Sequence, residues 1–168
     1  MQKYLDKIFK AVKQDGAFFF LLTILDLPII FQALVGNKDF FLYVKYFIFA
    51  AMLNFAVMLA INFSVPKKKP LKKFLQRLFV ILFSIMFVSE SLFLWKFQRE
   101  FDVSAVEFLI ENLFEPDVLI GIIFFTALLI AGADDLRKIF KSMSTKKIRR
   151  ITYAVLIIFL FTIIFSVV

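Results

Sequence analysis

Three ionisable residues interrupt long apolar stretches and are the first candidates for chemistry: Asp26, Lys45 and Glu90. A charged side chain at mid-membrane costs about 2.5–3.5 kcal/mol, so such a residue usually faces a partner or a wet cavity. At about 1.5 Å per residue along a helix, all three fall in the same half of a bilayer. We therefore expect Lys45 to pair with Glu90, and Asp26 to join them. Further candidates for interhelical hydrogen bonds are Gln32, Asn54 and Asn62.

Two interpretations of this cluster remain open. It either fixes the packing of the helices, or it lines a polar cavity that holds a lipid headgroup. Lys45 can alternatively extend outward to the membrane interface. A proton or ion pathway is a weaker interpretation, because it needs acidic groups at several depths and the inner half of the apolar stretches holds none.

The composition excludes most familiar catalytic groups. The sequence contains no Cys and no His. Disulfides, Cys-containing zinc sites, Ser-His-Asp and Cys-His catalysis and His-ligated haem are therefore excluded. We assign no catalytic residue and no metal ligand to this chain.

The segments that carry Asp26, Lys45 and Glu90 are long apolar stretches. Of the 168 residues, 62% are hydrophobic and 26 are Phe, whereas soluble domains are about 45–50% apolar. A stretch of about 20 apolar residues spans a bilayer. Residues 1–168 are therefore predicted to form a single transmembrane domain, an all-α polytopic membrane helix bundle of about five transmembrane helices. The predicted spans are 17–35, 40–63, 74–95, 117–133 and 151–168.

The connections between the spans alternate in charge. The 64–73 loop holds five Lys and no acid, the 96–117 loop is acidic, and the 134–150 loop is basic. The positive-inside rule then places the N-terminus in the cytoplasm and the C-terminus outside. The basic cytoplasmic loops account for the net charge of +8. We therefore do not expect nucleic acid as a partner. Membrane lipids are the expected partners, with contacts to anionic lipid from Lys67, Lys68, Lys69, Lys72 and Lys73.

Three amphipathic segments, 2–15, 104–115 and 134–143, are predicted as short interfacial helices, and Gly16 can end the first. The basic segments 2–15 and 134–143 act as topology determinants or lie against anionic headgroups. The segment 104–115 carries an acidic row of Glu107, Glu111 and Glu115. This row is either a solvated face or a rim for a cationic headgroup, a metal or an adjoining domain.

Residues 92–123, LFLWKFQREFDVSAVEFLIENLFEPDVLIGII, resemble the region after the third transmembrane helix in membrane-anchored sulfatase-like transferases. These are the lipoteichoic acid synthase and phosphoglycerol transferase group and, more distantly, the phosphoethanolamine transferases. The resemblance implies a bacterial cytoplasmic (inner) membrane location. Asn112 and Glu115 are the nearest counterparts of an Asn and a Glu that contact the donor lipid in phosphoethanolamine transferases, although their spacing differs.

The same resemblance implies that catalysis takes place elsewhere. The family's nucleophile and its metal-binding residues belong to an extracytoplasmic α/β domain after the fifth span. Because the sequence stays apolar up to Val168, we expect that domain, with its divalent metal, to follow in the complete protein and to be a partner of this one. The expected function is a membrane anchor and lipid-substrate platform for a phosphoglycerol or phosphoethanolamine transferase, or for hydrolysis of a related ester. The alternative is a small non-enzymatic membrane protein, such as a transporter-like or channel-like subunit or an assembly partner.

Overall fold

The computed structural model describes residues 2–35, 39–65, 69–97, 107, 110–112 and 114–167. Residues 3, 35, 69, 89, 92–97, 117, 166 and 167 of these are described by their backbone alone. The described part of the chain contains no strand and forms the helices α1 (Gln2–Leu25), α2 (Pro28–Val35), α3 (Phe40–Ser64), α4 (Lys69–Phe97), α6 (Pro116–Ser142) and α7 (Thr145–Val167).

Proline and capping residues set the ends of these helices. Pro28 lacks a backbone N–H and restricts the residue before it, so α1 ends at Leu25 and α2 begins at Pro28. Asp39 caps α3, because its carboxylate accepts hydrogen bonds from the backbone N–H groups of Phe41 at 3.0 Å and Leu42 at 3.4 Å. Pro116 occupies the first turn of α6, where the missing N–H costs nothing.

Four stretches of the described residues are long and apolar enough to cross a membrane: Tyr4–Leu34, Phe40–Ser64, Val118–Ser142 and Thr145–Phe165. Together with the all-helical fold, they confirm the predicted class, an all-α membrane helix bundle. The remaining predicted span, 74–95, lies within α4, which has 29 residues. Helix α3 ends at Ser64 and α4 begins at Lys69.

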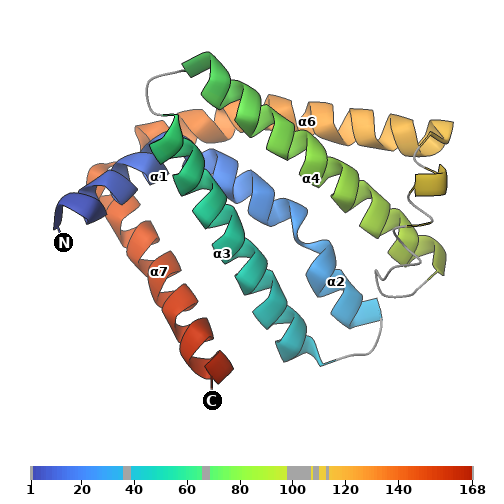
Figure 1. The fold of residues 1–168 in the computed structure, drawn as a ribbon, viewed down its shortest axis with the longest axis horizontal. Coiled ribbons are helices and arrows are strands. Elements are labelled where there is room, and N and C mark those ends of the chain that lie inside the picture. Colours follow the sequence, from blue (N-terminus) through green and yellow to red (C-terminus); the bar gives the residue numbers. More distant parts are fainter. Residues whose placement is uncertain are drawn as a thin grey trace.

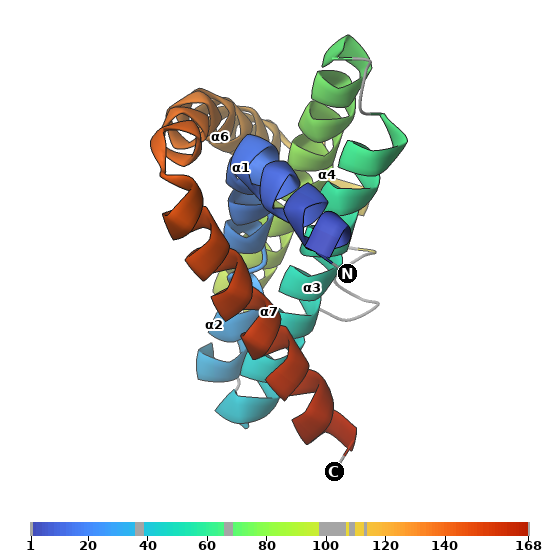
Figure 2. The same ribbon diagram turned by 90° about the vertical axis from the view of Figure 1, so that its left-hand side faces the viewer.

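Helix α1 is the centre of the bundle and packs against α3, α4, α6 and α7. Figure 1 shows α4 and α6 along one side of α1, with α3 and α7 along the other. In Figure 2, turned by 90°, α1 lies between α6 and α3. Polar residues carried by α1 therefore meet side chains from several helices at once.

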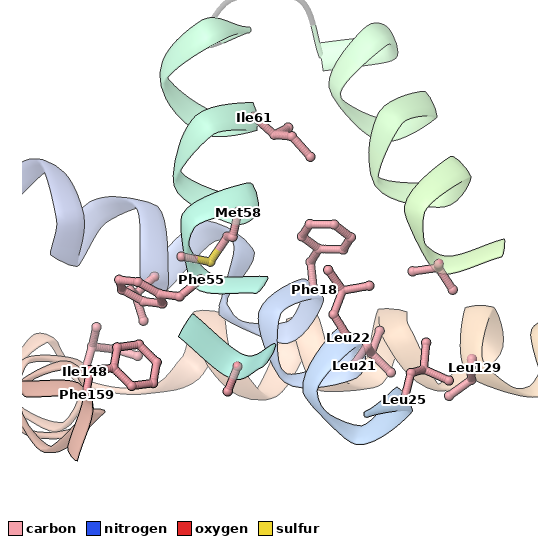
Figure 3. Close-up of a cluster of buried hydrophobic side chains, with 13 residues drawn as sticks. Phe18, Leu21, Leu22, Leu25, Phe55, Met58, Ile61, Leu129, Ile148 and Phe159 are labelled. Carbon is pink, nitrogen blue, oxygen red and sulfur yellow. The ribbon is translucent and has the colours of Figure 1, made fainter. Parts of the chain in front are cut away.

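A continuous apolar core surrounds α1. Leu22 is completely buried, and Met58 of α3 and Ile148 of α7 are each 1% exposed. Figure 3 shows these side chains gathered with Phe18 and Leu25 of α1. The outward faces carry exposed apolar side chains such as Phe124 and Phe161, as expected of surfaces that contact lipid acyl chains.

Two of the predicted interfacial helices are not separate helices. Segment 2–15 is the first part of α1, which continues through Gly16, and most of segment 134–143 is the last part of α6. Their apolar faces pack within the bundle: Val12 is buried, and the ring of Phe140 lies against the backbone at Gly16. A Cβ atom on Gly16 would lie 2.6 Å from Cε1 of Phe140. Gly16 therefore permits a close helix contact instead of ending a helix.

Candidate functional site

An acidic cavity of about 210 Å³ opens between α1, α2, α3 and α4. Its walls are mainly apolar, and its polar side chains among the described residues are Asp26, Asn54 and Glu90. The volume matches that of several water molecules. The complete lining consists of Leu25, Asp26, Ile29, Ala50, Leu53, Asn54, Phe83, Met86 and Glu90.

The break between α1 and α2 positions Asp26. The turn at Asp26 and Leu27 is closed by a backbone hydrogen bond from Ile29 N–H to the Asp26 carbonyl at 3.1 Å. The Asp26 carboxylate is buried and accepts a hydrogen bond from Nδ2 of Asn54 at 2.5 Å. Asn54 is 1% exposed, so this hydrogen bond satisfies a side chain that would otherwise be costly to bury.

Glu90 enters the cavity from α4 and is half-buried. It lines the same cavity as Asp26, and two carboxylates in one cavity repel each other when both are ionised. No cationic side chain lines the cavity among the described residues. The cavity therefore combines two acidic groups and an amide with apolar walls, an arrangement that favours a positively charged guest.

The predicted pairing of Lys45 with Glu90 was wrong, because no ion pair joins these two described residues. Asn54 lies nine positions after Lys45 on α3, which is about two and a half helical turns. Lys45 therefore points to the opposite side of α3 from Asn54, and it does not line the cavity. Equal depth in the membrane does not bring two side chains together, because the rotation of each helix about its axis decides where they point. Asp26 and Glu90 line the same cavity, which Lys45 does not line.

A second polar cluster, the Asp15 network, was predicted only in Asn62, the candidate for an interhelical hydrogen bond. It consists of Asp15, Asn62, Lys72, Gln76 and Arg137, contributed by α1, α3, α4 and α6. Asp15 is buried, and its carboxylate accepts hydrogen bonds from Asn62, from Lys72 and, at 2.8 Å, from Nε2 of Gln76. Lys72 also donates to Oδ1 of Asn62 at 2.7 Å. A buried ion pair with this many hydrogen bonds offsets much of its own desolvation.

A sequence signal for this network existed. Asp15 interrupts the apolar stripe Ile8, Val12, Phe19, Leu22 of α1, and an acid within an apolar face indicates a buried partner. In the sequence, however, Asp15 precedes the first predicted span and resembles an ordinary charge of a polar flank.

The network corrects one of the predicted lipid contacts. The Lys72 side chain is 15% exposed and forms an ion pair with Asp15, so it points into the bundle. Lys73 is exposed. Lys67 and Lys68 lie outside the described residues, as does the side chain of Lys69.

The acidic residues of the predicted outer helix do not join the acidic cavity. Glu107 and Glu115 are exposed, Asn112 is half-buried, and none of them lines it. Glu115 precedes α6 as its N-cap residue. Residues 98–106 lie outside the described part of the chain, so the predicted helix 104–115 is described only in part. Nowhere among the described residues do three acidic side chains gather as a cation site.

Fold and site together define an α-helical membrane protein with an acidic cavity inside its helix bundle. Comparison with known proteins gave no match to a family model, to a curated protein or to a solved structure. The resemblance to sulfatase-like transferases therefore stays a prediction.

Proposed function

We propose that this chain is the membrane domain of a sulfatase-type headgroup transferase and that the acidic cavity binds the cationic headgroup of its lipid substrate. The observation that carries the proposal is the pair of carboxylates, Asp26 and Glu90, in one apolar-walled cavity. An ionised acid within a membrane is costly without a counter-charge. A primary ammonium group supplies that charge, and the Asn54 side-chain amide adds polarity beside it.

This chemistry distinguishes between the two headgroups that the resemblance implies. A phosphoethanolamine group carries an ammonium, whereas a phosphoglycerol group carries no positive charge. Two carboxylates therefore favour a phosphatidylethanolamine donor. The charge pattern of the loops supports an orientation with the N-terminus in the cytoplasm and the acidic cavity toward the outer leaflet. In that orientation the cavity holds the donor near a catalytic, metal-binding domain outside the bacterial cytoplasmic membrane.

A binding experiment tests the cavity. The purified chain in maltoside micelles is titrated with dioctanoyl phosphatidylethanolamine and, separately, with dioctanoyl phosphatidylglycerol. We expect saturable binding of the ethanolamine lipid, and a loss of about 10- to 100-fold in affinity in Glu90→Gln, as for removal of a charged hydrogen-bond partner. Asp135→Asn, which removes an exposed carboxylate outside the cavity, is the matched control. Equal affinity of Glu90→Gln and the wild type would refute the role of the cavity.

The transferase assignment has its own test. Reading the gene beyond codon 168 should reveal a soluble α/β domain with a nucleophilic Thr or Ser and Asp, His and Glu metal ligands. A stop codon directly after Val168 would overturn the transferase assignment and leave the binding result intact.

One observation favours the second candidate, a transporter-like subunit. Asp15 lies 11 residues before Asp26 on the chain, about 16 Å along a helix, so buried carboxylates occur at two depths. Proteoliposomes with an imposed pH gradient distinguish the candidates: proton flux that Asp26→Asn abolishes supports the subunit, and absence of flux supports the anchor.

A further inference from the structure

A second pocket, which we call the basic pocket, lies between α1, α4 and α6 and has a volume of about 120 Å³. It is separate from the acidic cavity and shares no lining residue with it. Its charged side chains are Lys73, Arg77, Asp134 and Arg137. The rest of the lining is Gln76 with Ala17, Phe18, Leu21, Val80, Ile130 and Ala133.

Helical spacing gives the basic pocket a charged end and an apolar end. Helix α4 contributes Lys73, Gln76, Arg77 and Val80 in chain order, and α6 contributes Ile130, Ala133, Asp134 and Arg137. Each set follows the i, i+3, i+4, i+7 pattern of one helix face. Figure 1 shows α4 and α6 running in opposite directions side by side, so the charged ends of the two sets coincide. Val80 and Ile130 then meet at the other end.

The Asp15 network holds one of these cations in place. Arg137 donates from its guanidinium to Oε1 of Gln76 at 3.1 Å, and Gln76 donates in turn to Asp15 at 2.8 Å. Gln76 is buried, at 5% exposed. Because Gln76 uses both ends of its amide in this way, the orientation of the guanidinium is set before any ligand binds, which lowers the entropic cost of binding.

The other two cations, Lys73 and Arg77, are available to bind a ligand. Lys73 and Arg77 are exposed and form no ion pair with a described side chain. The opposing acid, Asp134, is largely exposed and lies 3.6 Å from the Arg137 guanidinium. Three cations against one carboxylate leave the lining with a net charge of +2. The charged end is therefore suited to an anion.

We propose that the basic pocket binds the headgroup phosphate of an anionic phospholipid. Guanidinium groups match the geometry of phosphate oxygens and bind them in a bidentate way. The apolar end suits the glycerol backbone and the start of an acyl chain, which a free inorganic anion lacks. A membrane-spanning bundle is surrounded by lipid, and basic pockets between transmembrane helices are known sites for anionic headgroups. This inference does not depend on the proposed function, since the basic pocket and the acidic cavity share no lining residue.

The test measures lipid binding to the complete chain in maltoside micelles by calorimetry. The probes are dioctanoyl phosphatidylglycerol, zwitterionic dioctanoyl phosphatidylcholine and inorganic phosphate. The Lys73→Gln/Arg77→Gln double variant removes two exposed cations of the pocket, and Lys146→Gln/Arg150→Gln removes two exposed cations from α7. At about fivefold in affinity for each cation near the surface, we expect phosphatidylglycerol to bind the first variant about 25-fold more weakly.

Four outcomes of this experiment decide whether the basic pocket binds an anionic phospholipid. Saturable binding of one phosphatidylglycerol, weakened in the pocket variant and unchanged in the α7 variant, supports the site. Equal weakening in both variants would mean a general charge effect and would overturn it. Displacement of the lipid by an equimolar concentration of phosphate would assign the pocket to a free anion. Equal affinity for phosphatidylcholine would show that the phosphate charge is not recognised, which also contradicts the proposal.

Discussion

Replacing Asp15 with Asn should destabilise the bundle more than any other single removal of charge among the described ion pairs. Asp15 is the acceptor shared by Asn62, Lys72 and Gln76, and its side chain is 5% exposed. Asn keeps the shape and one acceptor oxygen but removes the charge. The Lys72 ammonium then stays in the bundle without its counter-ion.

The magnitude follows from the burial of the two partners. Removing one partner of a buried ion pair costs about 3–5 kcal/mol. The Lys72 side chain keeps 15% exposure and can take up some water, so we expect a loss of about 2–3 kcal/mol in the free energy of unfolding, below that range. The Asp15→Asn/Lys72→Met double variant should lose less than the sum of the single variants, by about 1–2 kcal/mol, because it leaves no unpaired charge.

Equilibrium unfolding by sodium dodecyl sulfate in mixed micelles, followed by circular dichroism, measures these differences. Asp6→Asn is the matched control, because Asp6 pairs with Arg149 at 3.2 Å and both side chains are more than half exposed. Its expected cost is below about 1 kcal/mol. Equal losses in Asp15→Asn and Asp6→Asn, or strict additivity in the double variant, would refute the view that Asp15 and Lys72 form a buried pair.

Two further predictions concern packing. Gly16→Ala should cost about 1–3 kcal/mol through the clash with Phe140, and Phe140→Leu in the same chain should recover part of the loss. Gly132→Ala meets nothing within 4 Å, so it should instead stabilise the helix by about 0.5–1 kcal/mol. Leu22→Ala, at a fully buried position, should cost about 2–5 kcal/mol, whereas Leu160→Ala on an exposed face should stay within about 0.5 kcal/mol. Unfolding in mixed micelles measures all of them, and a neutral Gly16→Ala or Leu22→Ala would contradict the packing described.

The helices themselves were largely predictable. The predicted spans 40–63 and 151–168 correspond to α3 (Phe40–Ser64) and to most of α7 (Thr145–Val167). Errors arose where a helix continues beyond its apolar part. Hydropathy marks the end of an apolar stretch, but α1 and α6 continue as helices through their charged segments. Gly16, which resembles a helix C-cap in the sequence, lies inside α1. The ring of Phe140 occupies the space that a side chain at Gly16 would fill.

The candidate sites were only partly predictable, for a different reason. Asp26 and Glu90 stood out because charge inside an apolar stretch is visible along the chain. Asp15 and Lys72 are 57 positions apart, and each looks like an ordinary flanking charge in the sequence. Lys45 is the opposite case. Its depth in the membrane suggested an ion pair with Glu90, but the rotation of α3 directs its side chain elsewhere.

The sequence by itself determined that this chain is an all-helical membrane protein and where acidic groups enter its apolar stretches. Those properties belong to single segments: each stretch must satisfy its own backbone hydrogen bonds in lipid, whatever its neighbours are. Only the tertiary structure decided which polar side chains meet. It joins Asp15 to Lys72, closes the acidic cavity around Asp26 and Glu90, and brings the basic faces of α4 and α6 together. Those contacts depend on how each helix is rotated and which helix lies beside it, and periodicity along one segment specifies neither.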